Sequence, residues 1–125
     1  MLELLEADER YTLDVLYGGT TILPRFGKPY LDWTEYDDYC VVYHEVEGSC
    51  DRSMAKSVGL GVIEYTTAIA ASAPDAVLII GDRYEALAAA VAAHYLRIPI
   101  IHLQGGEVSG ALDDGARRAI TQLAS

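Results

Sequence analysis

The sequence AVLIIGDR at residues 76–83 decides the fold of this chain. Its first five residues form an unbroken apolar run, typical of a strand buried on both faces, and the run stops at Gly81-Asp82. An alanine-rich segment follows, and a second run, IPII at 98–101, leads into HLQGGE at 102–107. This order predicts a βαβ unit. Because a right-handed crossover brings the carboxyl ends of both strands to one edge of the sheet, Asp82 and the loop 102–107 are expected to face one cleft.

The flanking segments extend the same α/β pattern. We expect strands at residues 11–17 and 40–46, helices over 53–73 and 84–96, and the end of a further helix at residues 2–5. Asp113 or Asp114 is expected to cap a final helix. The predicted inner faces carry Met54, Val58, Val62, Tyr65 and Ile69 in the first of these helices, Tyr84, Leu87, Ala88, Val91 and Tyr95 in the second, and Ala116, Ile120 and Leu123 in the last.

This element order is that of a doubly wound parallel α/β domain whose first strand is missing. In the common strand order 3-2-1-4-5-6, that first strand is central, between the strands predicted at 11–17 and 76–80. Its absence would leave a gap in the sheet. Either the chain is a fragment whose true start lies upstream, or 11–17 is the first strand of a smaller sheet. We favour the fragment, and treat residues 1–125 as a partial domain.

The composition describes one globular domain that can bury a core, with 51% apolar and 22% charged residues in 125. Nineteen acidic residues against nine basic ones give a formal net charge of −10, which argues against nucleic acid as the main partner. An anionic small molecule is still compatible with this charge, because arginines and backbone N–H groups can hold phosphate inside an acidic protein.

The two cysteines, Cys40 and Cys50, lack the spacing of a zinc site, and we interpret both as reduced thiols. The chain opens without a basic and apolar secretory signal, and no apolar stretch is long enough to span a membrane. These features predict a cytoplasmic protein with no membrane partner.

Several polar groups near the two strand ends have both a functional and a structural interpretation. Asp82 is a cleft carboxylate or a turn residue that bonds a nearby backbone N–H. Arg83 is a clamp on phosphate or carboxylate, or a solvated neighbour. His102 is a ligand to sugar or phosphate, or a structural histidine like the other two. Asp113 is a catalytic carboxylate or an N-cap, and the glycines at 105–106 allow close ligand approach or form an ordinary turn.

These motifs together carry a family resemblance. The sequences GDRYEALAAA at 81–90, HLQGGEVSG at 102–110 and the Asp113-Asp114 pair followed by RRAIT at 117–121 closely resemble hydrolysing UDP-N-acetylglucosamine 2-epimerases. The resemblance is dense from about Met54 onward and thinner before it. It implies a GT-B-type enzyme of two Rossmann-like domains, of which this chain matches most of the first. The family's opening strand and its C-terminal nucleotide-binding domain have no counterpart in the 125 residues, which we therefore expect to be inactive by themselves.

The reaction that the resemblance implies converts UDP-N-acetylglucosamine to N-acetylmannosamine and UDP, which supplies sialic-acid-type sugar synthesis. UDP is eliminated across C1 and C2, and water then adds to the resulting glycal. No cofactor and no metal is implied. The implied partner is a small-molecule nucleotide sugar, and the full-length protein is expected to form a homo-oligomer.

Residue by residue, the match places Asp82 and Asp113 at catalytic carboxylates of the family. Gln104 stands where many members have glutamate, and an amide can hydrogen-bond substrate but cannot act as a base. Either Asp82 and Asp113 divide the acid/base work, or Glu107 supplies the missing carboxylate, or activity is reduced. Arg118 replaces the family's usual histidine. The implied substrate-binding residues are Arg83, His102, Gly105, Gly106, Glu107, Ser109 and Arg117.

Three functions compete at this point. The first is the hydrolysing epimerase, with UDP or GDP as the nucleotide. The second is a sugar-nucleotide-binding module without catalysis, which Gln104 favours. The third, a non-hydrolysing epimerase or glycosyltransferase of the same architecture, is disfavoured by GDR at 81–83 and by the loop at 105–110.

Overall fold

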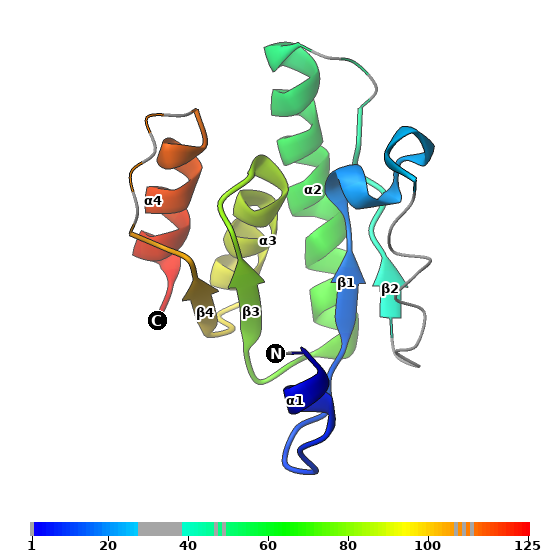
Figure 1. The fold of residues 1–125 in the computed structure, drawn as a ribbon, viewed down its shortest axis with the longest axis vertical. Coiled ribbons are helices and arrows are strands. Elements are labelled where there is room, and N and C mark those ends of the chain that lie inside the picture. The colour runs from blue at the N-terminus through cyan, green and yellow to red at the C-terminus, as the bar shows by residue number, and fades with distance from the viewer. Residues whose placement is uncertain are drawn as a thin grey trace.

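The computed structural model describes residues 2–27, 39–46, 48, 50–106, 108, 110 and 112–125. Strands and helices alternate along most of this chain (Figure 1). The elements are α1 (Leu2–Glu6), β1 (Val15–Tyr17), two short 3₁₀ turns (Gly19–Ile22 and Pro24–Phe26), β2 (Tyr39–Val41), α2 (Asp51–Ser72), β3 (Val77–Ile80), α3 (Tyr84–Tyr95), β4 (Ile100–Leu103) and α4 (Asp113–Leu123).

The described strands form two separate parallel pairs. β1 pairs with β2, with Leu16 opposite Cys40, and β3 pairs with β4, with Ile79 opposite His102. Between β1 and β3 lies a cavity of about 400 Å³ that residues of both strands line. The cavity occupies the position of the gap predicted from the strand order, and no strand of the described residues lies between β1 and β3. The predicted α/β fold with parallel strands is confirmed.

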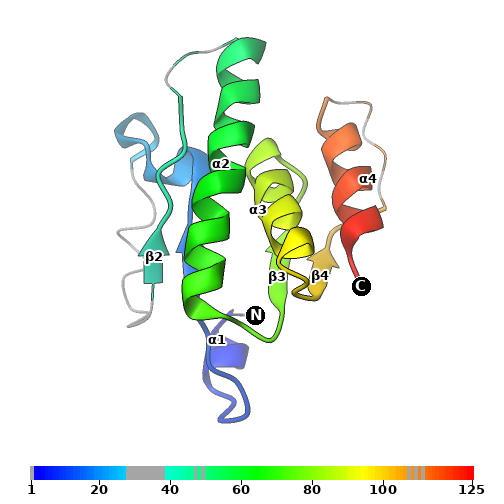
Figure 2. The same ribbon diagram turned by 180° about the vertical axis from the view of Figure 1, so that it is seen from behind.

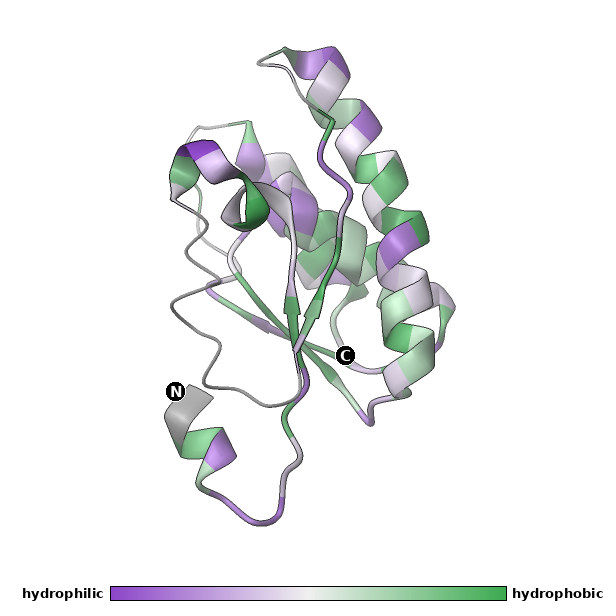
Figure 3. Cartoon of the chain, turned by 90° about the vertical axis from the view of Figure 1, so that its right-hand side faces the viewer, coloured by the Kyte–Doolittle hydropathy of each residue, from purple (hydrophilic) through white to green (hydrophobic). Residues whose placement is uncertain are grey.

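Helices α2 and α3 lie side by side behind the strands, as the view from the back shows (Figure 2). Viewed from the side, both helices lie on the same side of the strands (Figure 3). The buried core combines Tyr65 and Ile69 of α2 with Ile79 of β3, Ile100 of β4 and Ile120 of α4. One core therefore joins α2, the βαβ unit of β3, α3 and β4, and the final helix.

The inward face of α2 differs from the prediction in its first half. Ser53, Ser57 and Gly61 are buried there, whereas the predicted Met54, Val58 and Val62 are only half-buried. The reason is close packing, because a Cβ built on Gly61 would lie 2.8 Å from Ala88 Cβ and 3.1 Å from the ring of His44. Small residues let α2 approach α3 and His44, and larger ones are displaced to the flanks.

Helix α3 buries alanines. Ala88, Ala90, Ala92 and Ala93 are fully covered because α2 packs on one side of α3 and α4 on another. Placing Tyr95 on the inner face is wrong, since it is 82% exposed in the last turn of the helix.

Several predicted boundaries shift. Residues 11–14 do not pair as a strand, so β1 keeps only the last three residues of the predicted 11–17. β2 covers Tyr39–Val41 where a strand at 40–46 was predicted. β4 covers Ile100–Leu103, so it starts and ends two residues later than the predicted run at 98–101 and includes His102. None of the helices in the described ranges is long and apolar enough to cross a membrane.

Candidate active site

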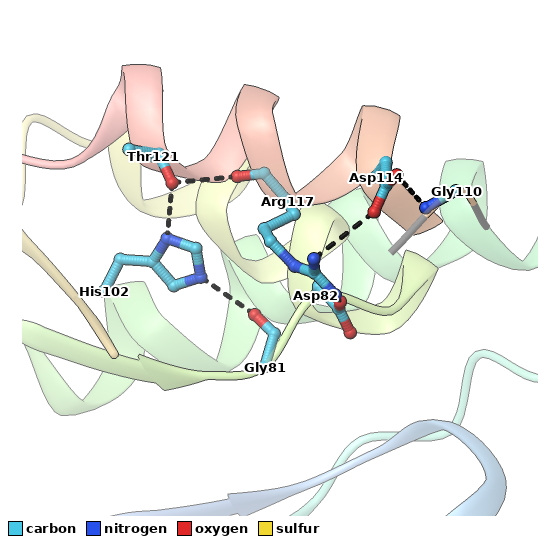
Figure 4. A network of polar contacts seen from close by, with 7 residues as sticks. All are labelled: Gly81, Asp82, His102, Gly110, Asp114, Arg117 and Thr121. Carbon is cyan, nitrogen blue, oxygen red and sulfur yellow. Dashed lines mark hydrogen bonds and ion pairs between the residues drawn. The ribbon is translucent and has the colours of Figure 1, made fainter. Parts of the chain in front are cut away.

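Asp82 and Arg117 form an ion pair at the carboxyl edge of β3 (Figure 4). Asp82 directly follows the strand and Gly81, whereas Arg117 lies in the second turn of α4 and donates through Nη2 to Asp82 Oδ2. The side chain of Arg117 is 10% exposed and that of Asp82 is 20% exposed. The carboxylate therefore binds a charged group from a distant helix.

Asp114 is a second carboxylate on the same guanidinium. Its Oδ1 lies 3.3 Å from Arg117 Nη1, and its Oδ2 accepts the Gly110 N–H at 2.7 Å. The spacing of three residues places Asp114 and Arg117 on neighbouring turns of α4. Asp114 thus joins the preceding loop to the guanidinium that holds Asp82. The sequence analysis considered Asp114 as a helix cap and as part of the Asp113-Asp114 motif, although its i,i+3 spacing to Arg117 could have indicated the pair.

His102 extends this network along the sheet edge. Its Nε2 lies 2.9 Å from the Gly81 carbonyl and its Nδ1 lies 3.0 Å from Thr121 Oγ1. A carbonyl can only accept, so Nε2 carries a proton and donates it. Nδ1 then accepts from the Thr121 hydroxyl or, when protonated, donates to it while that hydroxyl donates to the Arg117 carbonyl 3.0 Å away. The bond from Nε2 to Gly81 therefore fixes the position of the imidazole beside Thr121.

Gly105 makes room for the histidine. A Cβ at this position would lie 2.7 Å from Thr121 Oγ1 and 2.8 Å from His102 Nδ1. A larger residue would displace the imidazole or the hydroxyl, so the glycine is needed for a contact within the protein. Gly106 has a φ of 82°, a region that favours glycine, and a Cβ there would meet open space.

The remaining predicted residues lie around this network or outside the described part. Gln104 is exposed at the end of β4 with a φ of 62°, which is unusual for a residue with a Cβ. Asp113 is the first residue of α4, whose N-cap is Leu112, so the prediction of Asp113 as the cap is wrong. Arg83 contacts Thr20 Oγ1 at 3.2 Å. Glu107 and Ser109 lie outside the described residues.

A second polar group, which the sequence analysis missed, lies beside the carboxyl end of β1. Tyr84 donates to Glu45 Oε1 at 2.6 Å, and Glu85 Oε1 lies 3.3 Å from Arg83 Nε. Burial raises the pKa of the Glu85 carboxyl, and burial together with the bond to Glu45 raises the pKa of Tyr84. Both groups are therefore held toward their neutral forms.

His44 belongs to this second group and has a defined tautomer. Its Nε2 accepts the Gly19 N–H at 2.9 Å, so its Nδ1 carries the proton and donates to the Ser57 carbonyl at 3.1 Å. The ring is 2% exposed and lies against Tyr65. The structural interpretation of His44 is confirmed.

The network at β3, β4 and α4 has the parts of an acid/base site. Asp82 is held by a guanidinium, and the His102 imidazole bonds the carbonyl of the preceding Gly81. The exposed amide of Gln104 and the first residue of α4 lie on the loop-helix segment that follows β4. General acid/base catalysis needs such groups held in place at the reacting atoms.

Comparison with known proteins identifies relatives along nearly the whole chain. Residues 3–125 match the model of a family described as UDP-N-acetylglucosamine 2-epimerase. A UDP-N,N'-diacetylbacillosamine 2-epimerase (hydrolyzing) of Legionella pneumophila is 37% identical over 111 residues, covering 89% of this chain and 28% of the relative. A GDP/UDP-N,N'-diacetylbacillosamine 2-epimerase (hydrolyzing) of Campylobacter jejuni is 31% identical over 121 residues, covering 95% and 32%. The chain spans about a third of the length of these relatives.

Solved structures agree with the fold. A UDP-GlcNAc 2-epimerase from Neisseria meningitidis, bound to UDP-GlcNAc, superposes with a TM-score of 0.72 at 21% identity over 96% of this chain and 33% of that one. A second UDP-N-acetylglucosamine 2-epimerase superposes with a TM-score of 0.79 at 17% identity, covering 98% and 33%. The expected half of a GT-B-type fold is confirmed.

Proposed function

The chain belongs to the UDP-N-acetylglucosamine 2-epimerase family, and from that premise we propose that it carries acid/base residues of a hydrolysing 2-epimerase. The substrate class is a nucleotide-linked 2-acetamido sugar. The observation that carries the proposal is the pairing of Asp82 with Arg117 at the carboxyl edge of β3, where ligands bind in open α/β sheets.

The chemistry needs two acid/base groups at the sugar. A base removes the proton from C2, the C1–O bond breaks, and the nucleoside diphosphate leaves with the bonding electrons. Water then adds its hydroxyl to C1 and a proton returns to C2 on the opposite face. We propose Asp82 and Asp113 for the two proton transfers. Arg117, tied down by Asp114, fixes the orientation of Asp82.

Gln104 has a positioning role in this proposal. Its φ of 62° holds it in a region that costs a residue with a Cβ on the order of 1 kcal/mol or more, and such strain is often kept at functional sites. Its exposed amide can bind a sugar hydroxyl or the acetamido group. We propose UDP-N-acetylglucosamine as the substrate, with N-acetylmannosamine as a product for sialic-acid-type sugars. The names of the two curated relatives make diacetylbacillosamine and a GDP-linked sugar the alternatives.

A chimera tests the proposal, in which this chain is continued by the remaining part of the Legionella pneumophila relative. Asp82→Asn is expected to lower turnover by ~100- to 10,000-fold, the usual loss for one general acid/base group, while binding of the nucleotide sugar persists. Asp75→Asn, at an exposed residue outside the network, is the matched control. If Asp82→Asn keeps more than about a tenth of the turnover, which corresponds to only ~1.4 kcal/mol, then Asp82 does not transfer a proton.

The binding module without catalysis is the second candidate, because Gln104 cannot act as a base. It predicts a chimera that binds UDP-N-acetylglucosamine but releases neither UDP nor a free sugar. Assaying the UDP- and GDP-linked sugars side by side separates the substrate alternatives in the same experiment.

A further inference from the structure

Both ring nitrogens of His102 are used by contacts within the protein. Nε2 donates to the Gly81 carbonyl at 2.9 Å, and Nδ1 lies 3.0 Å from Thr121 Oγ1. A Cβ built on Gly105 would lie 2.8 Å from Nδ1, so the backbone of the loop after β4 covers that side of the ring. A histidine that binds substrate needs a nitrogen that faces the ligand. His102 offers neither nitrogen, which argues against the substrate-binding role expected from the sequence.

The carbonyl that His102 holds belongs to the residue before Asp82. Gly81 leaves β3 with a φ of 93°, and a Cβ built there would meet nothing within 4 Å. Because glycine has the widest choice of backbone conformations, packing alone does not fix the peptide between Gly81 and Asp82. The Gly81 N–H bonds the Leu103 carbonyl at 3.3 Å, and the Gly81 carbonyl accepts from His102. Strand β4 therefore holds this glycine through both of its backbone polar groups.

Helix α4 reaches Asp82 by two routes (Figure 4). Arg117 bonds the carboxylate, and Thr121, one turn further along α4, holds the imidazole that bonds the preceding peptide. The Thr121 hydroxyl lies 3.0 Å from the Arg117 carbonyl, so both routes start from neighbouring turns of one helix. The contacts form a closed ring that runs from Asp82 through α4 and His102 back to Gly81. A carboxylate held at its tip and at its backbone has little freedom to turn.

We propose that His102 is a positioning residue for Asp82 and does not contact the substrate. The inference rests on the proposed role of Asp82 in proton transfer. The Nε2–H of the imidazole holds the Gly81 carbonyl, which sets the direction in which the Asp82 side chain leaves the backbone. Thr121 acts one step further away by holding the imidazole. Since a misplacement of about 1 Å can lower a rate ~100-fold, this tether is expected to affect turnover more than binding.

Two amide side chains separate the roles of the two ring nitrogens. The amide nitrogen of glutamine reaches about as far from the backbone as Nε2, and that of asparagine about as far as Nδ1. His102→Gln therefore keeps a donor for the Gly81 carbonyl, whereas His102→Asn keeps only a partner for Thr121.

The two variants are compared in the chimera with the Legionella pneumophila relative. His102→Asn is expected to lower kcat by ~10- to 100-fold and to leave KM within about twofold. His102→Gln is expected to stay within about fivefold in kcat, the size of one lost neutral hydrogen bond. His94→Asn, at an exposed histidine in the last turn of α3, is the matched control and is expected to change neither constant.

Other roles of His102 give different patterns, and each would overturn the proposal. A histidine that binds the sugar predicts a raised KM in both variants. A histidine that transfers a proton predicts equal losses of kcat in both, together with loss of one limb of the pH–rate profile, because neither amide is an acid or a base. Unchanged kcat in His102→Asn would mean that the tether has no effect on catalysis.

Thr121→Val provides a second variant in case His102→Asn does not fold. Loss of the hydroxyl loosens the imidazole, and kcat is expected to fall by about fivefold with KM unchanged. Thr67→Val, on the exposed side of α2, is expected to have no effect on either constant. Equal kcat in the two threonine variants would contradict the proposal.

The position of Asp82 also has a readout that does not depend on turnover. In the chimera labelled with carbon-13 at the aspartate carboxyl groups, Asp82→Asn identifies the Asp82 signal. His102→Asn is expected to shift this signal, and His102→Gln is expected to shift it much less. A signal that stays in place in His102→Asn would overturn the positioning role.

This readout separates failure of the positioning role from failure of the proposed function. If Asp82→Asn keeps most of the turnover, Asp82 does not transfer a proton, and the proposed function fails whatever the carboxyl signal does. If Asp82→Asn is severe while His102→Asn changes neither kcat nor the signal, the proposed function stands and the positioning role of His102 is wrong.

Discussion

Carboxylates lie beside the ends of both strand pairs, β3-β4 and β1-β2, but they differ in how fully they are paired. At the carboxyl end of β3, Asp82 shares a guanidinium with Asp114. Beside the end of β1, Glu85 has one oxygen near Arg83 and one oxygen without a partner in the described part of the chain. Residues 76–125 supply both strands and both helices around the first site, and they also supply Glu85, whose side chain reaches from α3 to Gly19 after β1. The second site borders the cavity between β1 and β3, which Glu85 helps to line.

The largest effect is expected at Arg117. Arg117→Met keeps much of the side-chain volume but leaves Asp82 and Asp114 as neighbouring carboxylates without their cation. Breaking a largely buried pair by removing one partner costs about 3 kcal/mol, which urea unfolding would measure. Arg118→Met is the matched control on the exposed face of α4, where about 0.5 kcal/mol or less is expected. Equal losses of stability in Arg117→Met and Arg118→Met would mean that the ion pairs of Arg117 with Asp82 and Asp114 do not stabilise the fold.

The next largest change in stability is expected at Gly61, where α2 packs against α3 and His44. In Gly61→Ala the new methyl meets Ala88 and His44, and overpacking of this kind costs about 1–3 kcal/mol, partly offset by the better helix propensity of alanine. Gly59→Ala lies on the same helix with nothing within 4 Å of its Cβ, and is expected to stabilise by up to about 1 kcal/mol. A lower melting temperature for Gly61→Ala and a higher one for Gly59→Ala would confirm that Gly61 is required by its contacts with Ala88 and His44, and not by helix propensity.

A smaller effect is expected at Thr121. Thr121→Val removes the hydroxyl that meets His102 Nδ1, at a cost of about 1 kcal/mol for a lost hydrogen bond. Thr67→Val is the control, because Thr67 bonds the Ile63 carbonyl four residues back but touches no histidine. Nitrogen NMR of His102 is expected to show the Nε2–H tautomer in both variants. An Nδ1–H tautomer would contradict the bond to Gly81.

The smallest effect is expected at Glu85, beside the end of β1, and concerns how the stability of the fold depends on pH. Because burial raises the pKa of Glu85, the folded chain binds a proton there more readily than the unfolded chain. The contribution of Glu85 to stability therefore improves as the pH falls through that raised pKa toward the ordinary value of 4.5, and worsens above it. Glu85→Gln is expected to remove this pH dependence and to stabilise the chain at pH 8 by about 1 kcal/mol or less. If the free energy of unfolding changes in the same way from pH 5 to pH 8 in the unchanged chain and in Glu85→Gln, this prediction is wrong.

Local sequence was sufficient to predict much of the unit that β3, α3 and β4 form. The apolar run at 76–80 is short, rich in β-branched residues and ended by Gly81, which favours a strand, and the alanine-rich segment after it favours a helix. The strand order even indicated the gap, since the doubly wound arrangement leaves its first strand central. The motifs at 81–90 and 102–110 indicated the family by resemblance. The match of residues 3–125 to the family model confirms that the chain belongs to it.

The contacts between distant residues depended on the tertiary structure. The pairing of Asp82 with Arg117, 35 residues apart, has no local signal, because two charges are brought together only when α4 packs against α3 and β4. Burial of Ser57 and Gly61 in place of Val58 and Val62 likewise depends on how closely α3 and His44 approach. Periodicity identifies an amphipathic helix, but the neighbours decide which side chains have room to face inward. The sequence by itself determined the elements and their order, and the packing of those elements decided which polar groups meet, because hydrogen bonds and ion pairs act only over a few ångströms.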